Sequence, residues 1–373
     1  MKFCNKYSLI DVSQFGFQCR KSTSDVLSQI HLTEIVYHAL NEKNNLLTVM
    51  IDFKKAFDTV NHQILIKKLE CYGIRATQLK WFSSYLSNRR CFVEIDKIRS
   101  NIEYMNIGVP QGSILGPILF LFYVNDISSV SSNFSTTLFA DDTTISISNP
   151  SFNSLINNSN FELNKLHIWT LENRLTLNVT KTFSLYFSNK KTTNVDERIV
   201  LGGEVVESVE SAKFLGVYLD QNLNFAPHIR YICGKISKHI GILYRIRDKL
   251  TLEAKLSYYY AFVYPYLSYN VCVWGSTYPT HLVPLIILQK RIVRLMTNSS
   301  YLSHTRPLFS ELGILEFNDI YKLNLLNFVH KSLSKNILAF NNNRNSRDLF
   351  LIKPSFHRLT KTQHSFYFTG PTE

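Results

Sequence analysis

Two adjacent carboxylates, Asp141 and Asp142, stand in the middle of the strand-prone stretch 136–148 (TTLFADDTTISIS). β-Branched and aromatic residues flank the pair, and neither glycine nor proline interrupts the stretch, which is typical of a β-hairpin whose tight turn carries both acids. Aspartate is also good turn chemistry, and most acid pairs in turns are only solvated. The pair alone therefore predicts a hairpin and does not decide whether the carboxylates have a chemical role.

A third acid, Asp52, follows the near-continuous apolar run 46–51 (LLTVMI). Such a run is typical of a strand that is buried on both faces. A carboxylate inside that sheet would need a partner or a metal ion, so we expect Asp52 at the open end of the strand. If that end lies beside the hairpin turn, three carboxylates converge. Hard oxygen ligands of this kind bind Mg²⁺, and two such ions can hold the attacking and leaving oxygens of a phosphoryl transfer.

Several elements must position these acids. After Asp52 the pattern predicts a helix at about 62–71, a strand pair at 91–96 and 102–107, a tight turn at 108–113 and a buried helix at about 115–126. The turn (GVPQGS) holds two glycines and a proline, which permits close approach of the backbone to a ligand. Beyond the hairpin we expect an amphipathic helix at 152–172 and a strand at 175–187.

Five motifs occur in a fixed order along the chain: 52–62 (DFKKAFDTVNH), 108–117 (GVPQGSILGP), 139–142 (FADD), 178–182 (NVTKT) and 214–220 (FLGVYLD). Together they resemble the reverse transcriptases of non-LTR (LINE-type, jockey-like) retrotransposons, and the resemblance runs from about residue 14 to the end of the chain. The family's reaction is template-directed transfer of a deoxynucleoside monophosphate to a primer 3′-OH, with release of pyrophosphate.

The resemblance implies a role for each matching residue. Asp52 and Asp141 would hold two Mg²⁺ ions (Mn²⁺ being the alternative), and Asp142 would support them as a ligand or through hydrogen bonds. Lys181 would protonate the leaving pyrophosphate; the alternative is a solvent-facing lysine on a strand. Phe57 would lie under the sugar and select deoxynucleotides; the alternative is an ordinary core phenylalanine. The residues expected at the nucleotide are Phe53, Phe57, Gln111, Gly112, Arg20 and Lys21.

The N-terminal part departs from the family pattern. Residues 14–23 (QFGFQCRKST) resemble the loop before a fingers helix, which we expect from Ser22 or Thr23 to about Asn41. Gln18 stands where the family usually has arginine, and the block that normally precedes the loop is absent. Arg20 and Lys21 are therefore the expected substitutes for the missing contacts to the incoming triphosphate. Asp58 lies between Asp52 and the helix expected at about 62–71. We expect it to cap a helix or accept a local hydrogen bond rather than bind metal.

A basic helix follows the last motif. Apolar residues recur at helical spacing between His228 and Leu250, and a second stripe of that helix is cationic. This basic stripe consists of Lys235, Lys238, Arg245 and Lys249. Cations on one helix face suit the phosphate backbone of a duplex, so we expect a thumb helix that contacts it. The tyrosine-rich segment 256–274 leaves two interpretations open, namely base stacking and packing of further thumb helices.

Composition limits the kinds of protein. The 373 residues are 45% hydrophobic and 18% charged, which is globular, and Lys plus Arg outnumber Asp plus Glu by 41 to 28. The formal charge of +13 favours a polyanionic partner. The six cysteines show no zinc-ligand spacing, and the chain start lacks the apolar run of a signal peptide. We therefore expect an intracellular protein, nuclear or cytoplasmic, with no membrane partner.

The combined interpretation is an α/β (α+β) right-hand polymerase with a ferredoxin-like palm, truncated fingers and a helical thumb. We expect a fingers remnant at 1–45, a palm at 46–225, a thumb at 226–300 and a helical segment with a polar tail at 301–373. The partners would be an RNA template, a DNA primer or RNA–DNA duplex, and dNTPs. The chain is expected to be a fragment of a longer polyprotein without its own endonuclease module. The alternatives are a decayed or repurposed remnant that only binds nucleic acid and, more weakly, an intron-type maturase.

Overall fold

The computed structural model describes residues 4, 6–19, 21–28, 32–189 and 198–334. These residues form two compact units. The sheet unit contains Met1–Val26 and Lys43–Val209, and the helical unit contains Leu27–Glu42 and Glu210–Glu373. This division differs from the expected domain boundaries, because residues 27–42 join the helical unit and that unit begins at 210 rather than 226.

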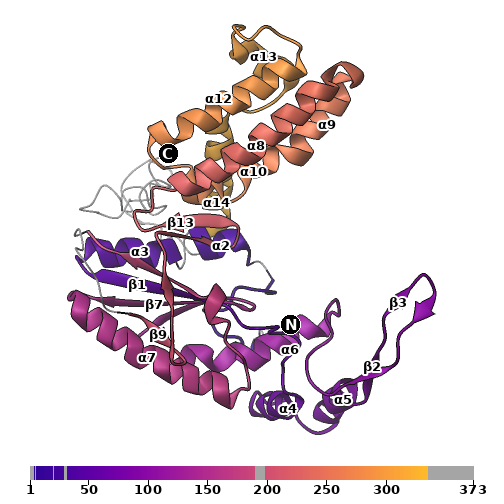
Figure 1. Ribbon diagram of the computed structural model, residues 1–373, viewed down its shortest axis with the longest axis vertical. Helices are drawn as coiled ribbons and strands as arrows, with labels where there is room; N and C mark the ends of the chain where they lie inside the picture. Colours follow the sequence, from indigo (N-terminus) through magenta and orange to yellow (C-terminus); the bar gives the residue numbers. More distant parts are fainter. Residues whose placement is uncertain (1–3, 5, 20, 29–31, 190–197, 335–373) are drawn as a thin grey trace, which may run out of the picture. The chain divides into compact units, whose positions relative to one another are not determined.

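A five-stranded sheet forms the centre of the sheet unit, in the order β11-β8-β1-β7-β6. Figure 1 labels its strands β1 and β7. The strands are β1 (Asn45–Ile51), β6 (Ser135–Phe139), β7 (Asp142–Asn149), β8 (Phe183–Phe187) and β11 (Glu207–Ser208). β1 lies antiparallel to both β7 and β8, and β6 lies antiparallel to β7. β1 and β6 therefore run in the same direction with β7 between them, which is a split β-α-β arrangement.

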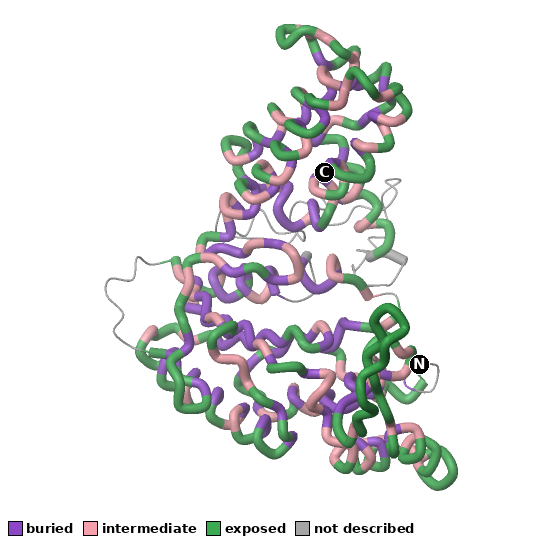
Figure 2. The backbone as a smooth tube through the Cα atoms, turned by 45° about the vertical axis from the view of Figure 1, so that its right-hand side comes forward, coloured by how far each residue is buried: buried purple, intermediate pink, exposed green. Residues whose placement is uncertain are grey.

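The central strand β1 is buried along its whole length, as its apolar run predicts. Leu47, Val49 and Ile51 point to one face, where they join the main hydrophobic core of the unit. Residues of α6 (Leu115–Val124) and α7 (Phe152–Glu172) complete that core. Figure 2 colours the chain by burial, with buried segments in purple and exposed segments in green. The sheet is thus a rigid support for whatever stands at the ends of its strands.

The remaining helices and short strands of the sheet unit surround this core. They are α4 (His62–Cys71), α5 (Ala76–Leu86), β2 (Arg89–Cys91), β3 (Glu94–Ile95), β4 (Ile98–Arg99), β5 (Glu103–Met105), η1 (Asn125–Ser129), η2 (Val179–Lys181), β9 (Val200–Leu201) and β10 (Glu204–Val205). β2 pairs with β5, and β3 with β4, in an exposed arm. The expected strand 175–187 is wrong in its first half, because a 3₁₀ turn precedes β8.

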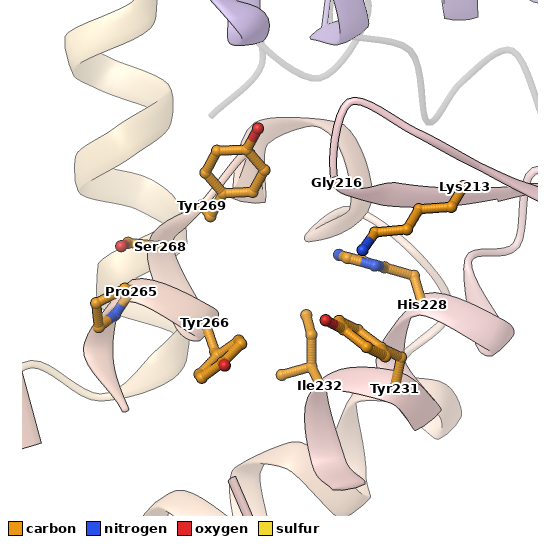
Figure 3. Close-up of a pocket in the computed structure, with 9 residues that line it drawn as sticks. All are labelled: Lys213, Gly216, His228, Tyr231, Ile232, Pro265, Tyr266, Ser268 and Tyr269. Carbon is orange, nitrogen blue, oxygen red and sulfur yellow. The ribbon is translucent and has the colours of Figure 1, made fainter. Parts of the chain in front are cut away.

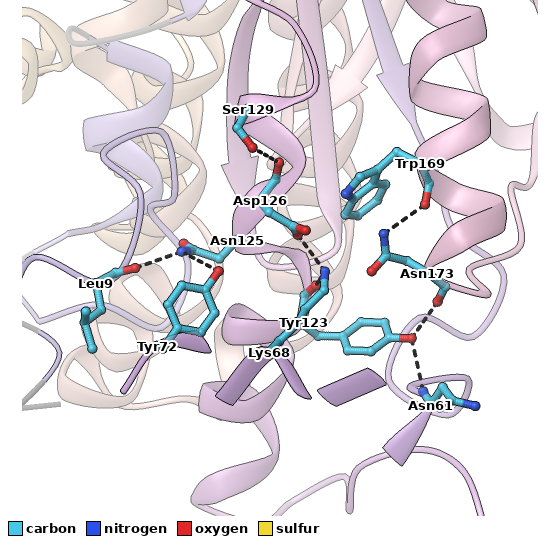
Figure 4. A network of polar contacts seen from close by, with 10 residues as sticks. All are labelled: Leu9, Asn61, Lys68, Tyr72, Tyr123, Asn125, Asp126, Ser129, Trp169 and Asn173. Atoms are coloured by element: carbon cyan, nitrogen blue, oxygen red, sulfur yellow. Dashed lines mark hydrogen bonds and ion pairs between the residues drawn. The ribbon is translucent and has the colours of Figure 1, made fainter. Parts of the chain in front are cut away.

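A polar network fastens α4 and α6 to the rest of the core (Figure 4). The Lys68 ammonium donates to the Asp126 carboxylate and to the Tyr123 carbonyl, each at 2.6 Å. Burial lowers the pKa of Lys68, and the neighbouring carboxylate partly offsets this. The Tyr123 hydroxyl donates to the Asn173 carbonyl at the end of α7 and accepts from the backbone N–H of Asn61. The helices that follow β1 are therefore fixed against those that follow the hairpin.

The helical unit combines one short hairpin with a set of packed helices. Its elements are α3 (Leu32–Asn41), β12 (Ser211–Phe214), β13 (Val217–Asp220), α8 (Ala226–Ile246), η3 (Arg247–Lys249), α9 (Leu252–Phe262), α10 (Tyr264–Ser268), α11 (Val271–Trp274), α12 (Pro279–Met296), α13 (Thr305–Leu312) and α14 (Phe317–Ser334). α2 (Thr23–Ser28) crosses from the sheet unit. The apolar stripe predicted for 228–250 is buried in α8. The expected polar tail lies outside the described residues.

No helix among the described residues is both long and apolar enough to span a bilayer.

Candidate active site

The predicted hairpin is confirmed, and its turn carries the acids as expected. β6 and β7 pair down to Phe139 opposite Asp142, so that Ala140 and Asp141 form the two-residue turn. Ala140 takes a left-handed conformation, with φ of 59°. That conformation costs a non-glycine residue roughly 1–2 kcal/mol, and here the tight turn requires it. Asp141 therefore stands at the tip, and Asp142 opens the outgoing strand.

Asp52 stands beside this turn. The antiparallel register pairs Ile51 of β1 with Thr143 of β7. The next positions along the two strands, Asp52 and Asp142, therefore reach the same end of the sheet. This agrees with the expectation that Asp52 occupies the open end of a buried strand.

The residues on either side of the 3₁₀ turn η2 hold Asp52 in place. The Asn178 side-chain amide donates to the Asp52 carboxylate at 2.6 Å, and its backbone N–H donates to the Asp52 carbonyl at 2.8 Å. The Asp52 N–H donates in turn to the Thr182 hydroxyl at 3.3 Å. Lys181 is exposed on this same turn, with its backbone N–H bonded to Asn178. The residue that contacts an acid is thus Asn178, which the sequence analysis did not single out.

The three acids share one electrostatic environment. Partial desolvation, followed by the charges of Asp141 and Asp52, raises the pKa of Asp142 to about 6. Desolvation and Asp52 also raise the pKa of Asp141, although the side chains of Asp141 and Asp142 still reach solvent. Like charges that destabilise one another in this way favour a bound cation.

The acids are close enough to interact electrostatically, but their side chains are not arranged as a complete set of metal ligands. Within residues 4–334, as far as they are described, no three His, Cys, Asp or Glu side chains are arranged to hold a metal ion. The donor chemistry nevertheless fits Mg²⁺, which accepts a few carboxylate oxygens and fills its other positions with water or phosphate. Asp52, Asp141 and Asp142 are the residues that would hold it.

A contact that the sequence analysis missed braces the acidic turn from the N-terminal side. Gln14 is 0% exposed, and its side-chain oxygen accepts the N–H groups of Ala140 at 3.1 Å and Gly16 at 2.8 Å. The backbone on either side of Gln14 also bonds to Leu138 of β6. A Cβ added at Gly16 would lie 2.4 Å from the Ala140 nitrogen, so only glycine permits this approach.

Lys21 is part of the same brace. Its ammonium donates to the carbonyls of Gln14 at 2.6 Å and Val12 at 3.3 Å, and burial lowers its pKa. The Gln18 amide donates to the Gln14 carbonyl as well, at 2.7 Å. Two of the three N–H donors of the Lys21 ammonium thus serve the backbone, and its expected contact with the triphosphate stays a prediction. Arg20, the other expected substitute, lies outside the described residues.

The two expected aromatic residues of the nucleotide site differ in burial. Phe57 is half-buried and stacks on Phe120 of α6, with ring centroids 4.4 Å apart, and it meets the edge of the Phe17 ring. One part of the Phe57 ring thus remains accessible. Phe53 is instead buried in the core and forms a β-bridge with Leu177, and its expected place at the nucleotide stays a prediction.

The glycine-rich turn 108–113 closes against the motif that follows Asp52. Gly108 and Gly112 both have positive φ, and a Cβ at Gly108 would lie 2.7 Å from the backbone of Asp58. The exposed Gln111 donates from its side-chain amide to the Asp58 carboxylate at 2.8 Å. Asp58 therefore accepts a distant hydrogen bond, and it is Asn61 that caps α4. The expected role of Asp58 as a helix cap or a local hydrogen-bond acceptor is therefore wrong.

The basic stripe lies mainly on α8 of the helical unit. Lys238 and Arg245 are exposed, and Lys235 is half-buried with its ammonium 5.4 Å from the centroid of the Tyr231 ring. Lys249 is exposed but lies in η3, beyond the end of the helix, which corrects its expected place. The stripe faces away from the buried isoleucines of α8.

For the tyrosine-rich segment 256–274, the structure supports helix packing for one of the rings. Tyr259 is fully buried, and its hydroxyl accepts from the Gln289 amide of α12 at 3.0 Å. Tyr260 and Tyr269 remain exposed. Core packing therefore holds for Tyr259, and base stacking stays a prediction for Tyr260 and Tyr269.

Comparisons with known proteins agree with this site. Residues 2–219 match the family described as reverse transcriptase (RNA-dependent DNA polymerase). In Drosophila melanogaster, the probable RNA-directed DNA polymerase from transposon BS is 29% identical over 318 residues, covering 81% of this chain and 34% of that protein. The polymerase from mobile element jockey is 26% identical (82% and 34% covered). The chain spans about a third of the length of these relatives.

A further relative agrees with these two. The probable RNA-directed DNA polymerase from transposon X-element of Drosophila melanogaster is 27% identical, covering 83% of this chain and 34% of that protein. A structure of telomerase from Candida albicans superposes with a TM-score of 0.40 at 13% identity, covering 79% of this chain and 54% of that one. The matched family segment includes all three acids and the turn that carries them. The chain therefore belongs to the reverse transcriptase family, and its resemblance to the polymerases of non-LTR retrotransposons is confirmed.

Proposed function

We propose that this chain is an RNA-directed DNA polymerase that adds deoxynucleotides to a primer 3′-OH. The observation that carries the proposal is the register of β1 against the β6–β7 hairpin, which brings Asp52, Asp141 and Asp142 to one end of the sheet. Their mutual repulsion supports a cation site there. The family match supports the same reaction.

Divalent metal ions are the cofactors this chemistry calls for. Asp52 and Asp141 would hold two Mg²⁺ ions, with Mn²⁺ as the alternative, and Asp142 would act as a ligand or as a hydrogen-bonding support. When bound, such ions supply an activated 3′-OH and charge neutralisation at the leaving pyrophosphate. The contribution of the chain is placement: Asn178 orients the Asp52 carboxylate, and Gln14 holds the turn that carries Asp141.

The nucleotide would lie between the acids and the turn 108–113. Phe57 keeps part of its ring accessible and would exclude a ribose 2′-OH, while Gln111 and Gly112 would flank the template–nucleotide pair. Lys181 is exposed on the turn that holds Asp52, so it remains the proposed general acid for pyrophosphate. In this proposal the sheet unit supplies the palm, and the helical unit supplies the thumb.

The proposed partners are an RNA template, a DNA primer or RNA–DNA duplex, and dNTPs. The basic stripe would contact the phosphates of the duplex, since its exposed cations follow one helix face. We also propose an intracellular protein, nuclear or cytoplasmic, whose endonuclease is supplied by a separate module.

Primer extension on a homopolymer RNA template with Mg²⁺ tests the proposal. The unaltered chain should extend the primer. Asp141→Asn should lower the extension rate by more than the roughly 10–100-fold that hydrogen-bonding partners of metal ligands typically contribute. Asp248→Asn, which removes one charge from an exposed site in η3, is the matched control and should retain activity. An unaltered chain that binds the template–primer but never extends it would instead establish a binding-only protein.

A further inference from the structure

A pocket of about 360 Å³ lies within the helical unit, between the β12–β13 hairpin and the helices α8 and α10. Its walls are largely aromatic and aliphatic, and no described Asp or Glu lines it. The lining residues that matter here are Lys213, His228, Tyr231, Ile232, Tyr266 and Tyr269 (Figure 3). The reaction proposed above uses none of them.

The loop after the hairpin fixes His228 in one orientation. The buried carboxylate of Asp220 accepts three backbone N–H groups, the strongest from Phe225 at 2.7 Å, and so sets the start of α8. The Tyr218 N–H then points to Nδ1 of His228 at 3.4 Å. The Trp274 ring packs edge-on against the imidazole, with centroids 5.4 Å apart. Because Nδ1 accepts, the proton of the neutral ring is assigned to Nε2.

That Nε2–H group is a buried donor that lacks an acceptor. His228 is 2% exposed, and its Nε2 has no hydrogen-bond partner among the described residues. Figure 3 shows the outer ring nitrogen of His228 pointing into the pocket beside the ammonium of Lys213. Burial, with a smaller contribution from Lys213, lowers the pKa of His228 to about 4, so the ring is neutral at pH 7. Two N–H donors, one of them charged, thus converge at one end of the pocket.

Three tyrosine rings line the pocket beyond this end, together with Ile232 and Pro265. The Tyr231 ring lies on the side of Lys213, whose ammonium is 5.3 Å from the ring centroid. Tyr266 and Tyr269 line the opposite side (Figure 3). The Tyr269 hydroxyl donates to the Leu215 carbonyl at 2.8 Å, so the hairpin turn holds this ring in position. A planar ligand would find ring faces or edges on two sides.

We propose that this pocket binds one unpaired nucleotide, with its phosphate on Lys213 and His228 and its base against the tyrosine rings. The paired donors favour an anionic oxygen, and the absence of a lining carboxylate among the described residues favours it further. The aromatic walls favour a planar base. The inference deepens the proposed function and rests on it for the choice of a nucleotide over other aromatic anions. A free nucleotide and a nucleotide within a single strand share this chemistry.

Equilibrium dialysis of labelled AMP against the full chain tests the pocket, with EDTA present so that no divalent metal takes part. The unaltered chain should bind AMP more tightly than it binds adenosine or inorganic phosphate, since each of these lacks half of the recognised groups. Lys213→Met and His228→Asn should each weaken AMP binding by roughly tenfold or more, the usual effect of losing a hydrogen bond to a charged group. His228→Gln, which restores a donor near the Nε2 position, should stay within about threefold of the unaltered chain.

Lys80→Met is the matched control, because it removes the same charge from an exposed position on α5 of the sheet unit, and it should leave AMP binding unchanged. Displacement of AMP by a short single-stranded oligoadenylate would assign the pocket to a strand, and AMP binding without displacement would assign it to a free nucleotide. Equal AMP affinity in the unaltered chain, Lys213→Met and His228→Asn would overturn the inference. So would the lack of AMP binding up to about 10 mM. Lys213 is exposed, so its variant keeps the test valid if a variant at the buried His228 does not fold.

The test is independent of the polymerase proposal. A chain that binds AMP in this pattern yet extends no primer would refute the proposed function and keep the pocket. A chain that extends primers but binds AMP equally well in all variants would do the reverse.

Discussion

Replacing Gln14 by methionine should displace the acidic turn without unfolding the protein. Methionine has the length of glutamine but no strong acceptor, so the N–H groups of Ala140 and Gly16 would both lose their partner. A buried donor left unpaired costs about 1–3 kcal/mol, which gives about 2–6 kcal/mol for the two if the turn stays where it is. The turn can avoid that cost by moving its amides toward water. The expected result is therefore a shift of Asp141 rather than global unfolding.

Such a shift should appear in the chemical step. A displacement of about 1 Å at a reacting group can cost about a hundredfold, so we expect kcat for single-nucleotide addition to fall roughly 10–100-fold. The Kd for the RNA–DNA duplex should stay the same, since Gln14 is not a member of the basic stripe. Gln63→Met, on an exposed position of α4, is the matched control. A kcat within about twofold of the unaltered chain, with both variants equally folded by urea titration, would refute the role of Gln14 as a brace.

Three further predictions concern other parts of the molecule. Phe57→Ala should lower the ratio of dNTP to rNTP incorporation, because the ring no longer blocks the 2′-OH, and an unchanged ratio in an active variant would leave Phe57 as a core residue. Neutralising the three members of the basic stripe that lie on α8 should weaken duplex binding similarly for all sequences and flatten its log–log salt dependence by roughly 0.9 per lost contact, if the B-DNA coefficient applies; an unchanged slope would place the duplex elsewhere. His228 has a pKa of about 4 in the folded protein, below the usual 6.5, so its contribution to stability is complete above pH 6.5 and is lost as the pH falls toward 4. Urea titrations at the two ends of that range should show a loss in the unaltered chain that is smaller in His228→Asn, and equal losses would contradict the assignment.

The sequence was most informative where a local pattern decides the structure. The helices at 62–71 and 152–172 begin and end at the predicted residues. In the first of these, Asn61 caps the helix by accepting the Ile64 N–H at 3.1 Å, and in the second a long amphipathic period leaves no competing structure. The acidic hairpin was predictable for the same reason, since strand-forming residues flank one short turn on both sides.

The contacts that position the acids could not be predicted in this way. Gln14 and Ala140 are 126 positions apart, as are Asp52 and Asn178, and neither pair leaves a local period in the sequence. Lys21 shows a related limit. Its charge is visible in the sequence, but the backbone carbonyls that engage its ammonium come from the folding of the segment around Gln14. The resemblance to a family named the candidate reacting residues, and the structure was needed to identify the residues that hold them.

The most direct test of the central claim is the effect of a matching dNTP on duplex affinity at saturating Mg²⁺. The RNA–DNA duplex should carry a primer that ends without a 3′-OH, so that binding is measured without reaction. If Asp52, Asp141 and Asp142 form a polymerase site, the dNTP that pairs with the template should tighten the complex, a mismatched dNTP should not, and Asp141→Asn should abolish the difference. A duplex affinity that is the same with the matching dNTP, with a mismatched dNTP and with none would contradict the account.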